Sequence, residues 1–379
     1  MPPSRLGDAA EPLLIGKVAE PLLIGKAAEP LVIGKAAEPL VIGKAAEPLV
    51  IGKAAEPLVI GKAAEPLVIG IVNNMPDTAL RATERHFSEL LDAASCGQPI
   101  RLRLFHAPQV PRGAACHAYL SLAYESIDQL WDDRLDGLIV TGAEPRTLAL
   151  EDEPYWPALA RLTDWAEGRT LSTIWSCLAA QAAVLRANGI VRRPFGWKLS
   201  GVYATAKAAE HPITAGLPPY WRGPQTRHND LPEAELVASG HRILSRLPDA
   251  GADMFIREGR SLFVFMQGHP EYDPRALFRE HRRDIGRFLT RERDRYPDPM
   301  QGYFDKPAEA ALDTLREEAL RTRDPALLER LPELLAGWVP PYDWRGPVVQ
   351  MYTNWLLYLT QRKCGDVAAT QLHGVAAEL

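Results

Sequence analysis

The sequence predicts an α/β fold, in which a mostly parallel β-sheet is flanked by helices and a disordered or extended repeat precedes it. From residue 65 onward, short apolar segments alternate with segments of helical apolar spacing. This alternation is typical of a parallel sheet that is covered on both faces. Polar residues also follow directly after several apolar segments, at the sheet edge where such folds place their sites.

A nine-residue repeat occupies the beginning of the chain. Variants of the motif EPLVIGKAA recur from Glu11 onward, and the seventh copy begins at Glu65 and runs on into a different sequence, IVNNMP. The near-identity of the copies indicates a tandem duplication, and each copy is interrupted by proline and glycine. We therefore expect residues 1–64 to be disordered and the folded part, residues 65–362, to begin within the last copy.

The first half of the folded part contains four candidate strands. Residues 67–73 and 135–141 are apolar runs that end at turn signals, residues 100–106 alternate in polarity, and residues 170–175 precede a strong helix former. Helices are predicted between and after them, from the spacing of their apolar side chains, at residues 77–94, 124–133, 157–168 and 177–185.

The second half is less regular. Residues 259–267 form an apolar strand, and a helix is expected over residues 274–291, because Asp273 can cap it and Pro274 suits its first turn. A helical insertion is predicted at about residues 300–345, followed by an apolar segment at 348–359 that packs on the core. Residues 363–379 are expected to form a C-terminal tail.

Composition excludes several classes of protein. The net charge of −5 argues against nucleic acid as a partner, and no apolar run reaches the roughly 20 residues of a membrane span. The four cysteines lie far apart without a CxxC pair, which argues against a disulfide framework or a metal site and favours a reducing, cytoplasmic location.

Cys177 is the candidate nucleophile. It lies between a predicted strand and a predicted helix, where the helix N-terminus stabilises a thiolate. The backbone N–H of Leu178 is then placed to bind an oxyanion. The alternative interpretation is a buried, unreactive cysteine in an alanine-rich helix, and position alone does not decide between the two.

His269 and Glu271 favour the catalytic interpretation. They lie two residues apart on an extended segment, so that their side chains point to the same side. Glu271 can therefore hold the imidazole in the tautomer that leaves one nitrogen free for a thiol. Together with Cys177 they form a candidate triad, although a histidine of this kind is by itself more often a satisfied polar residue.

The motifs of the folded part resemble those of the homoserine O-succinyltransferase and O-acetyltransferase family, whose fold is similar to that of class I glutamine amidotransferases. The matching residues are Asn73 with Met75 and Pro76, Thr83 and Glu84 with Phe87, DGLIVTGA at 136–143, YWP at 155–157, Cys177 with Gln181, Ala182 and Ala183, KLSGVY at 198–203, GHPEYD at 268–273 and TNW at 353–355. They extend from residue 66 to about 360. The surroundings of Cys177 lack the flanking glycines of an amidotransferase nucleophile, which favours the acyltransferases.

The resemblance implies roles for further residues. Lys198 and Thr226 are similar to substrate-contacting positions of the family, and Arg283 to the arginine that binds the carboxylate of the amino acid. The backbone of Gly142, with that of Leu178, is expected to stabilise the oxyanion. The implied reaction is a step of methionine biosynthesis with acyl-CoA as co-substrate and no bound cofactor, catalysed by a homodimer that acts on small molecules.

Arg146 departs from the family pattern. It stands at the position that selects the acyl group, where glycine accompanies succinyl and glutamate accompanies acetyl transfer. A guanidinium can pair with the free carboxylate of a succinyl group, which favours succinyl-CoA as the donor. Two other orientations stay open, in which the side chain fills the pocket or turns to solvent. Thr226 replaces the family serine, which leaves serine open as an acceptor beside homoserine.

Other functions stay open at this point. An acetyltransferase with homoserine or serine as acceptor has the same motifs. A glutaminase or hydrolase with the same triad, or a non-catalytic interaction protein that retains the fold, is compatible with the sequence as well.

Overall fold

The computed structural model describes residues 65–377, with side chains to residue 365, together with five short strands in the repeat. These strands are β1 (Leu22–Ile24), β2 (Leu31–Val32), β3 (Val41–Ile42), β4 (Leu49–Ile51) and β5 (Leu58–Ile60). Strand β1 pairs with the main sheet, and β2 to β5 form a separate four-stranded sheet. The rest of residues 1–64, where the sequence predicts disorder, lies outside the described residues.

The main sheet is built from the following strands: β6 (Leu67–Val72), β7 (Ile100–His106), β8 (Glu125–Ser126), β9 (Leu135–Val140), β10 (Thr170–Ser176), β11 (Arg193–Lys207), β12 (Tyr220–Asp230), β13 (Arg242–Leu247), β14 (Gly251–Arg257) and β15 (Leu262–Met266). In the described part of the chain their order is β1-β7-β6-β9-β10-β15-β14-β13-β11-β12, and β8 pairs with β7.

The centre of the sheet is parallel, which confirms the predicted fold class. Strands β7, β6, β9, β10 and β15 pair in parallel, and all of them coincide with residues predicted as strands, except that β10 continues one residue further, to Ser176. The strands β14, β13, β11 and β12 extend the sheet by antiparallel pairing. Residues 192–258, which contain these four strands, were assigned to no element, because charged residues, prolines and a β-bulge between Pro194 and Leu199 interrupt their pattern.

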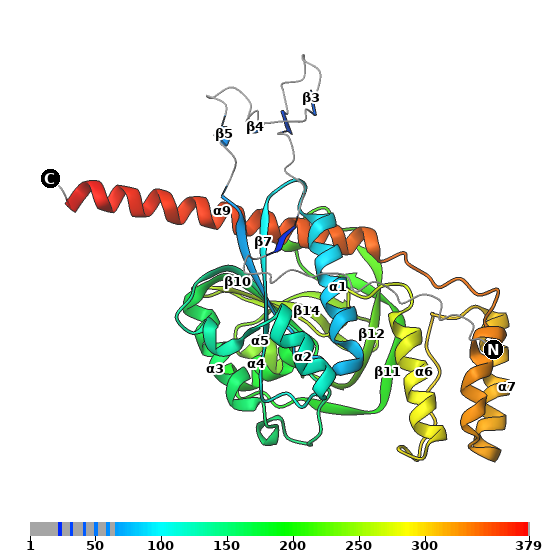
Figure 1. Ribbon diagram of the computed structural model, residues 1–379. Helices are drawn as coiled ribbons and strands as arrows, with labels where there is room; N and C mark the ends of the chain where they lie inside the picture. Colours follow the sequence, from blue (N-terminus) through cyan, green and yellow to red (C-terminus); the bar gives the residue numbers. More distant parts are fainter. Residues whose placement is uncertain are drawn as a thin grey trace, which may run out of the picture.

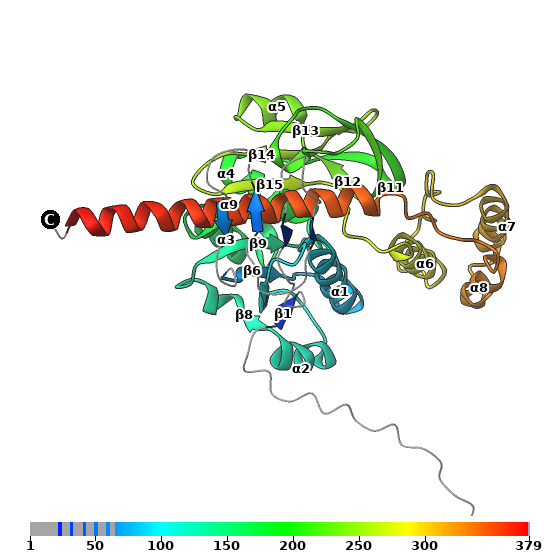
Figure 2. The same ribbon diagram turned by 90° about the horizontal axis from the view of Figure 1, so that it is seen from above.

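The helices are α1 (Asp77–Ala94), α2 (Ala114–Ala123), α3 (Trp156–Arg169), α4 (Leu178–Asn188), α5 (Glu233–Ala238), α6 (Ala276–Leu289), α7 (Lys306–Thr322), α8 (Leu331–Leu334) and α9 (Arg345–Ala377). Short 3-10 helices are η1 (Ile127–Leu130), η2 (Leu150–Asp152), η3 (Pro212–Thr214) and η4 (Pro325–Arg330). Helices α1 and α9 pack on one face of the sheet, and α3 and α4 pack on the other, as Figures 1 and 2 show.

Two hydrophobic clusters fill the space between these layers. One joins Phe87 and Leu90 of α1 to Trp355 of α9, and the other joins Leu162 of α3 to Ala180 of α4. Because side chains of the strands alternate between the two faces, the central strands β6, β9, β10 and β15 contribute to both clusters and are buried almost completely.

The structure corrects two predicted elements. Residues 124–133 do not form an α-helix but the strand β8 and the 3-10 helix η1, in which the Ser126 hydroxyl accepts a hydrogen bond from the Asp128 N–H. Residues 363–377 are not a separate tail, because α9 continues through them to Ala377 (Figure 2). The insertion at about 300–345 is helical as expected and contains α7, η4 and α8.

Within the residues that the structure describes, no helix combines the length and the apolar character that crossing a membrane requires.

Trp355 anchors helix α9 to strands β9 and β10, and its substitution tests how much this contact stabilises the fold. Trp355 is 1% exposed and donates a hydrogen bond of 2.9 Å from its Nε1 to the Ser172 Oγ. A Cβ built on Gly137 would lie 2.8 Å from the Trp355 ring, so the two elements pack without a gap. We predict that Trp355→Ala lowers the free energy of unfolding by about 3–5 kcal/mol, because it leaves a cavity and removes the hydrogen bond that the Ser172 hydroxyl accepts.

Urea unfolding followed by circular dichroism measures this loss. Leu357→Ala on the same helix is the control, because Leu357 is 54% exposed and its truncation is expected to change stability by about 0.5 kcal/mol or less. Equal effects of the two substitutions would contradict the packing described here.

Candidate active site

Cys177 occupies the sharp turn between β10 and α4, as the sequence predicts. Its backbone adopts φ 52° and ψ −112°, a conformation that non-glycine residues rarely take. Its N–H donates a hydrogen bond of 2.7 Å to the carbonyl oxygen of Met266, at the end of the neighbouring strand β15. The turn places the thiol at the carboxyl end of the sheet, partly exposed to a cavity.

His269 and Glu271 lie beside the thiol, on the segment that follows β15. The Nδ1 of His269 is 2.8 Å from the Oε1 of Glu271, and both side chains are buried. Burial lowers the pKa of His269, but the charges of Cys177 and Glu271 and hydrogen bonds to both raise it well above its ordinary value. The structure therefore favours an imidazolium beside the cysteine.

The backbone around Gly142 faces the first residue of α4. A Cβ built on Gly142 would lie 2.7 Å from the Leu178 Cβ and 3.1 Å from the Leu178 nitrogen, so only glycine fits. The loop is fixed by Asn74, whose N–H donates to the Thr141 hydroxyl at 2.8 Å and whose amide donates to the Thr141 carbonyl at 3.0 Å. The predicted oxyanion pair, Gly142 and Leu178, is thus brought together next to Cys177.

The cavity above Cys177 has a volume of about 220 Å³. Eight of the residues singled out from the sequence line it, namely Gly142, Cys177, Leu178, Lys198, Thr226, His269, Glu271 and Arg283. They come from elements that are distant in the sequence, since β9, β10, β11, β12, β15 and α6 all end or pass at this edge.

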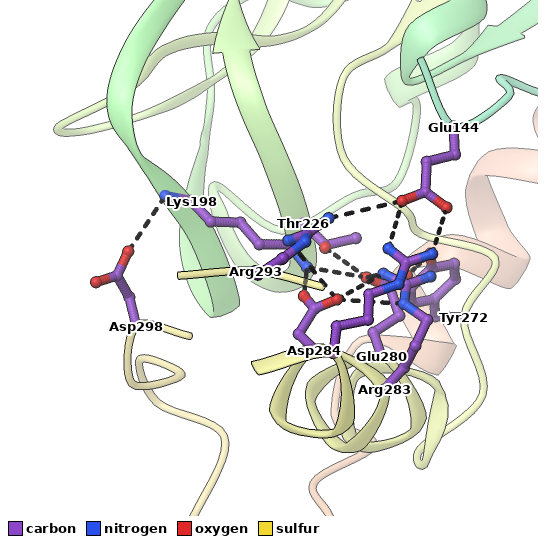
Figure 3. A network of polar contacts seen from close by, with 10 residues as sticks. Glu144, Lys198, Thr226, Tyr272, Glu280, Arg283, Asp284, Arg293 and Asp298 are labelled. Atoms are coloured by element: carbon purple, nitrogen blue, oxygen red, sulfur yellow. Dashed lines mark hydrogen bonds and ion pairs between the residues drawn. The ribbon is translucent and has the colours of Figure 1, made fainter. Parts of the chain in front are cut away.

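A network of charges covers one wall of this cavity (Figure 3). The Nζ of Lys198 lies 2.8 Å from the Oδ2 of Asp284 and 3.4 Å from the Oε2 of Glu280. Arg283 approaches the Oδ1 of Asp284 at 3.1 Å. The Thr226 hydroxyl donates to Glu280 at 2.6 Å, so the three predicted substrate-contacting residues meet at two carboxylates of α6.

Both carboxylates are held ionised. Burial raises the pKa of Asp284, but the charges of Lys198 and Arg283 lower it to about 2. Burial likewise raises the pKa of Glu280, and the charges of Lys198, Arg283 and His269 lower it below its ordinary value. Each is therefore a fixed negative charge at neutral pH.

Tyr272 connects the triad to this network. Its ring stacks on the imidazole of His269 with centroids 4.4 Å apart, and its hydroxyl donates to the Oε1 of Glu280 at 2.5 Å. Burial and the charge of Glu280 raise the pKa of Tyr272 well above its ordinary value, so the phenol stays protonated as a donor.

Arg146 does not line this cavity, so of the orientations that the sequence leaves open, the structure shows the one in which the side chain turns to solvent. The carboxylate of Glu153 accepts hydrogen bonds from the N–H groups of Arg146 and Thr147 and fixes their loop. The side chain of Arg146 is exposed and borders a neighbouring cavity. Glu144, two residues earlier, lines both cavities, and Arg287 binds it through Nη1 at 2.5 Å and Nη2 at 3.0 Å.

Sequence reasoning missed Glu280 and Asp284, together with Tyr272 and Arg192, which also line the cavity. Glu280 and Asp284 are four residues apart on α6, as neighbours on one helix face are, and Arg283 lies between them. That spacing is a usable signal, but it is also common on helices whose charged face is solvated. Only the position of α6 against the sheet shows that these carboxylates line a cavity. In the described residues, no group of three or more His, Cys, Asp or Glu side chains is placed to hold a metal ion.

Taken together, the cavity offers a nucleophile with an adjacent base, two N–H groups for an oxyanion and paired charges for a polar ligand. This set is suited to acyl transfer through a covalent intermediate.

Several known proteins that are similar to this chain in sequence share one description. The sequence profile of the family described as homoserine O-succinyltransferase matches residues 51–365. The chain is 48% identical to a homoserine O-succinyltransferase of Rhodopseudomonas palustris, over 76% of this chain and 87% of that relative. It is 45% identical to one of Methylorubrum extorquens, over 77% and 87%. A glutamine amidotransferase structure from Methylobacillus flagellatus aligns with a TM-score of 0.45 and 15% identity, over 78% of this chain and 95% of that chain.

The geometry of the triad predicts how His269 titrates. Glu271→Gln removes a negative charge beside the imidazole, which destabilises the protonated ring, so we predict that the pKa of His269 falls by about 1 to 3 pH units. NMR of protein labelled in histidine measures this value, and His269→Gln identifies the resonance by its loss.

Glu235→Gln is the matched control, because Glu235 pairs with Arg193 at the surface, outside the cavity. A pKa of His269 that is the same in Glu271→Gln and in the control would show that Glu271 does not act on the imidazole.

Proposed function

Because the chain belongs to the homoserine O-succinyltransferase family, we propose that it transfers a succinyl group from succinyl-CoA to the hydroxyl of L-homoserine. The observation that carries this proposal is the arrangement of Cys177, His269 and Glu271 in a cavity whose opposite wall carries fixed charges of both signs. The triad supports covalent acyl transfer, and the charges support an amino acid as the acceptor.

In the first half of the reaction, the Cys177 thiolate attacks the carbonyl carbon of the succinyl thioester. The negative charge that develops on the carbonyl oxygen is stabilised by the N–H groups of Leu178 and Gly142, an effect typically worth about 3–4 kcal/mol per donor. The bond to the CoA sulfur then breaks, and the departing thiolate takes the proton of the His269 imidazolium. A succinyl thioester on Cys177 and free CoA result.

In the second half, neutral His269 removes the proton of the homoserine hydroxyl as the oxygen attacks the thioester carbon. The same two N–H groups stabilise the second tetrahedral intermediate. The bond to the Cys177 sulfur breaks, which releases O-succinylhomoserine and restores the thiolate beside the imidazolium. Glu271 holds the ring in one orientation through both halves, so that the other ring nitrogen faces the reacting atoms.

Helix α6 supplies the acceptor subsite of this proposal. Arg283 can bind the α-carboxylate of homoserine by a charge-assisted pair, and Glu280 can accept hydrogen bonds from its α-ammonium group. Both side chains line the cavity, and Lys198 and Thr226 hold Glu280 in place. An acceptor fixed at two points presents its hydroxyl to His269 in one geometry, which lowers the entropic part of the barrier.

We further propose that the enzyme has no bound cofactor, works in the cytoplasm and forms a homodimer. Support for a reducing location comes from the four cysteines, which are all free. The homodimer rests on the family resemblance, and light scattering tests it by the mass of the particle in solution.

Product formation tests the reaction directly. With succinyl-CoA and L-homoserine, the protein is expected to release CoA and O-succinylhomoserine in equal amounts, and Cys177→Ala is expected to abolish the release of both, because no other residue of the cavity is placed as the nucleophile. Liquid chromatography with mass detection measures both products, and Cys116→Ala on α2 is the control. Turnover by Cys177→Ala close to that of the control, or products formed only from acetyl-CoA, would contradict the proposal.

The role of Arg283 in the acceptor subsite can be tested separately from the nucleophile. Arg283→Gln is expected to lower kcat/KM for homoserine by about 10- to 100-fold, because a charge-assisted pair is lost. The burst of CoA release from succinyl-CoA alone should stay unchanged, because the first half of the reaction does not use Arg283. Arg282→Gln, an exposed neighbour on α6, is the control for the helix. A slower burst in Arg283→Gln would mean that this residue acts on the donor instead.

A further inference from the structure

Five lysine and arginine side chains line the cavity of Cys177, namely Arg192, Lys198, Arg227, Arg283 and Arg293. Four of them have carboxylate partners. Lys198 and Arg283 pair with Asp284, Arg227 pairs with Asp230 at 2.7 Å, and Arg293 lies 3.6 Å from Glu144. Among the described residues, Arg192 alone of the five has no carboxylate oxygen within 4.0 Å.

Arg192 is also weakly held by hydrogen bonds. Its Nη1 donates to the Gln181 Oε1 at 3.4 Å and its Nη2 to the Leu148 carbonyl at 3.3 Å, and both distances are long for a guanidinium. A guanidinium has five N–H donors, so most of its capacity is unused. Burial lowers the pKa of Arg192, and the nearby charges, those of Glu153 and Glu151 among them, offset only part of this effect.

The position of Arg192 relates it to the acyl group rather than to the acceptor. It follows α4, the helix that begins next to Cys177, and its partner Gln181 lies one turn along that helix. The Gln181 N–H donates to the Cys177 carbonyl at 3.3 Å. The charge of Cys177 is among those that act on Arg192. The acceptor subsite, in contrast, lies on α6, where every cation is already paired with a carboxylate.

From this geometry we infer that Arg192 binds the free carboxylate of the succinyl group and thereby selects succinyl-CoA over uncharged donors. The inference rests on the proposed function, because it assigns the donor specificity of that same site. A succinyl group on Cys177 carries its carboxylate two methylene groups beyond the thioester carbon, and an unpaired guanidinium is the group that such a carboxylate requires. Arg192 takes the role that the sequence suggested for Arg146, whose side chain is exposed outside the cavity.

Three donors separate the charge of the acyl group from its size. Succinyl-CoA has the carboxylate, butyryl-CoA has a methyl group in the same place, and acetyl-CoA lacks that part of the chain. We compare kcat/KM for these donors, with homoserine as acceptor, in the wild-type protein and in Arg192→Met and Arg192→Lys. Arg193→Met and Arg146→Met are the controls, because both remove an arginine that lies outside the cavity.

Arg192→Met is expected to lower kcat/KM for succinyl-CoA by about 10- to 100-fold and to leave butyryl-CoA and acetyl-CoA within about 3-fold of the wild-type values. The kcat/KM of Arg192→Lys for succinyl-CoA should lie between the values of the wild-type protein and Arg192→Met, because lysine keeps the charge and loses the bidentate geometry. The decisive quantity is the ratio of succinyl to butyryl transfer in one preparation, because partial misfolding lowers both rates equally and cancels.

Several results would overturn the inference. An unchanged ratio in Arg192→Met, with all donors slowed alike, would place Arg192 on the CoA moiety or on the thiolate. If the ratio of succinyl to butyryl transfer changes in Arg146→Met or Arg193→Met instead, that arginine and not Arg192 binds the succinyl carboxylate. If the wild-type protein transfers no succinyl group at all, the proposed function itself fails, and this outcome is visible before any variant is made.

Discussion

The turn at Cys177 is the constraint on which the rest of the site depends. Its backbone takes a φ of 52°, and the hydrogen bond from its N–H to the Met266 carbonyl joins the ends of β10 and β15. This strained conformation directs the thiol into the cavity, and it sets the first N–H of α4 against Gly142. Since His269 follows β15 by a few residues, one strand pair fixes nucleophile, base and oxyanion donors together. A substitution that relaxed this turn would move all of them.

The charges around the turn are arranged in two parts. On α6, Glu280 and Asp284 are paired with Lys198 and Arg283 before any ligand binds, so the charges there are largely balanced. Beside α4, the guanidinium of Arg192 has no carboxylate oxygen within 4.0 Å in the part of the chain that the structure describes. A zwitterionic acceptor can replace the existing ion pairs on α6 with its own carboxylate and ammonium groups. An anionic acyl group, in contrast, supplies the negative charge that Arg192 lacks. Tyr272 joins the balanced side to His269 by stacking and by its hydrogen bond to Glu280.

The central fold and the triad could be predicted because their signals are local. An apolar run ending at Asn73 or Cys177, and two residues spaced like His269 and Glu271, are visible in short windows of sequence. The antiparallel strands of residues 193–257 were not predicted, although most of them pair with their neighbours in the chain, because charged residues, prolines and a β-bulge interrupt their apolar pattern. The orientation of Arg146, which the sequence left open, depends on the three-dimensional setting of its loop, where Glu153 accepts hydrogen bonds from the N–H groups of Arg146 and Thr147. Arg192 was missed because the absence of a carboxylate partner is a property of three-dimensional surroundings.

The mass of the intact protein after incubation with succinyl-CoA alone tests the account most directly. The account predicts that the mass rises by one succinyl group, that peptide mapping places this group on Cys177, and that adding homoserine removes it and yields O-succinylhomoserine. A protein that turns over succinyl-CoA and homoserine while its mass never changes, or that carries the group on another residue, would contradict the covalent mechanism.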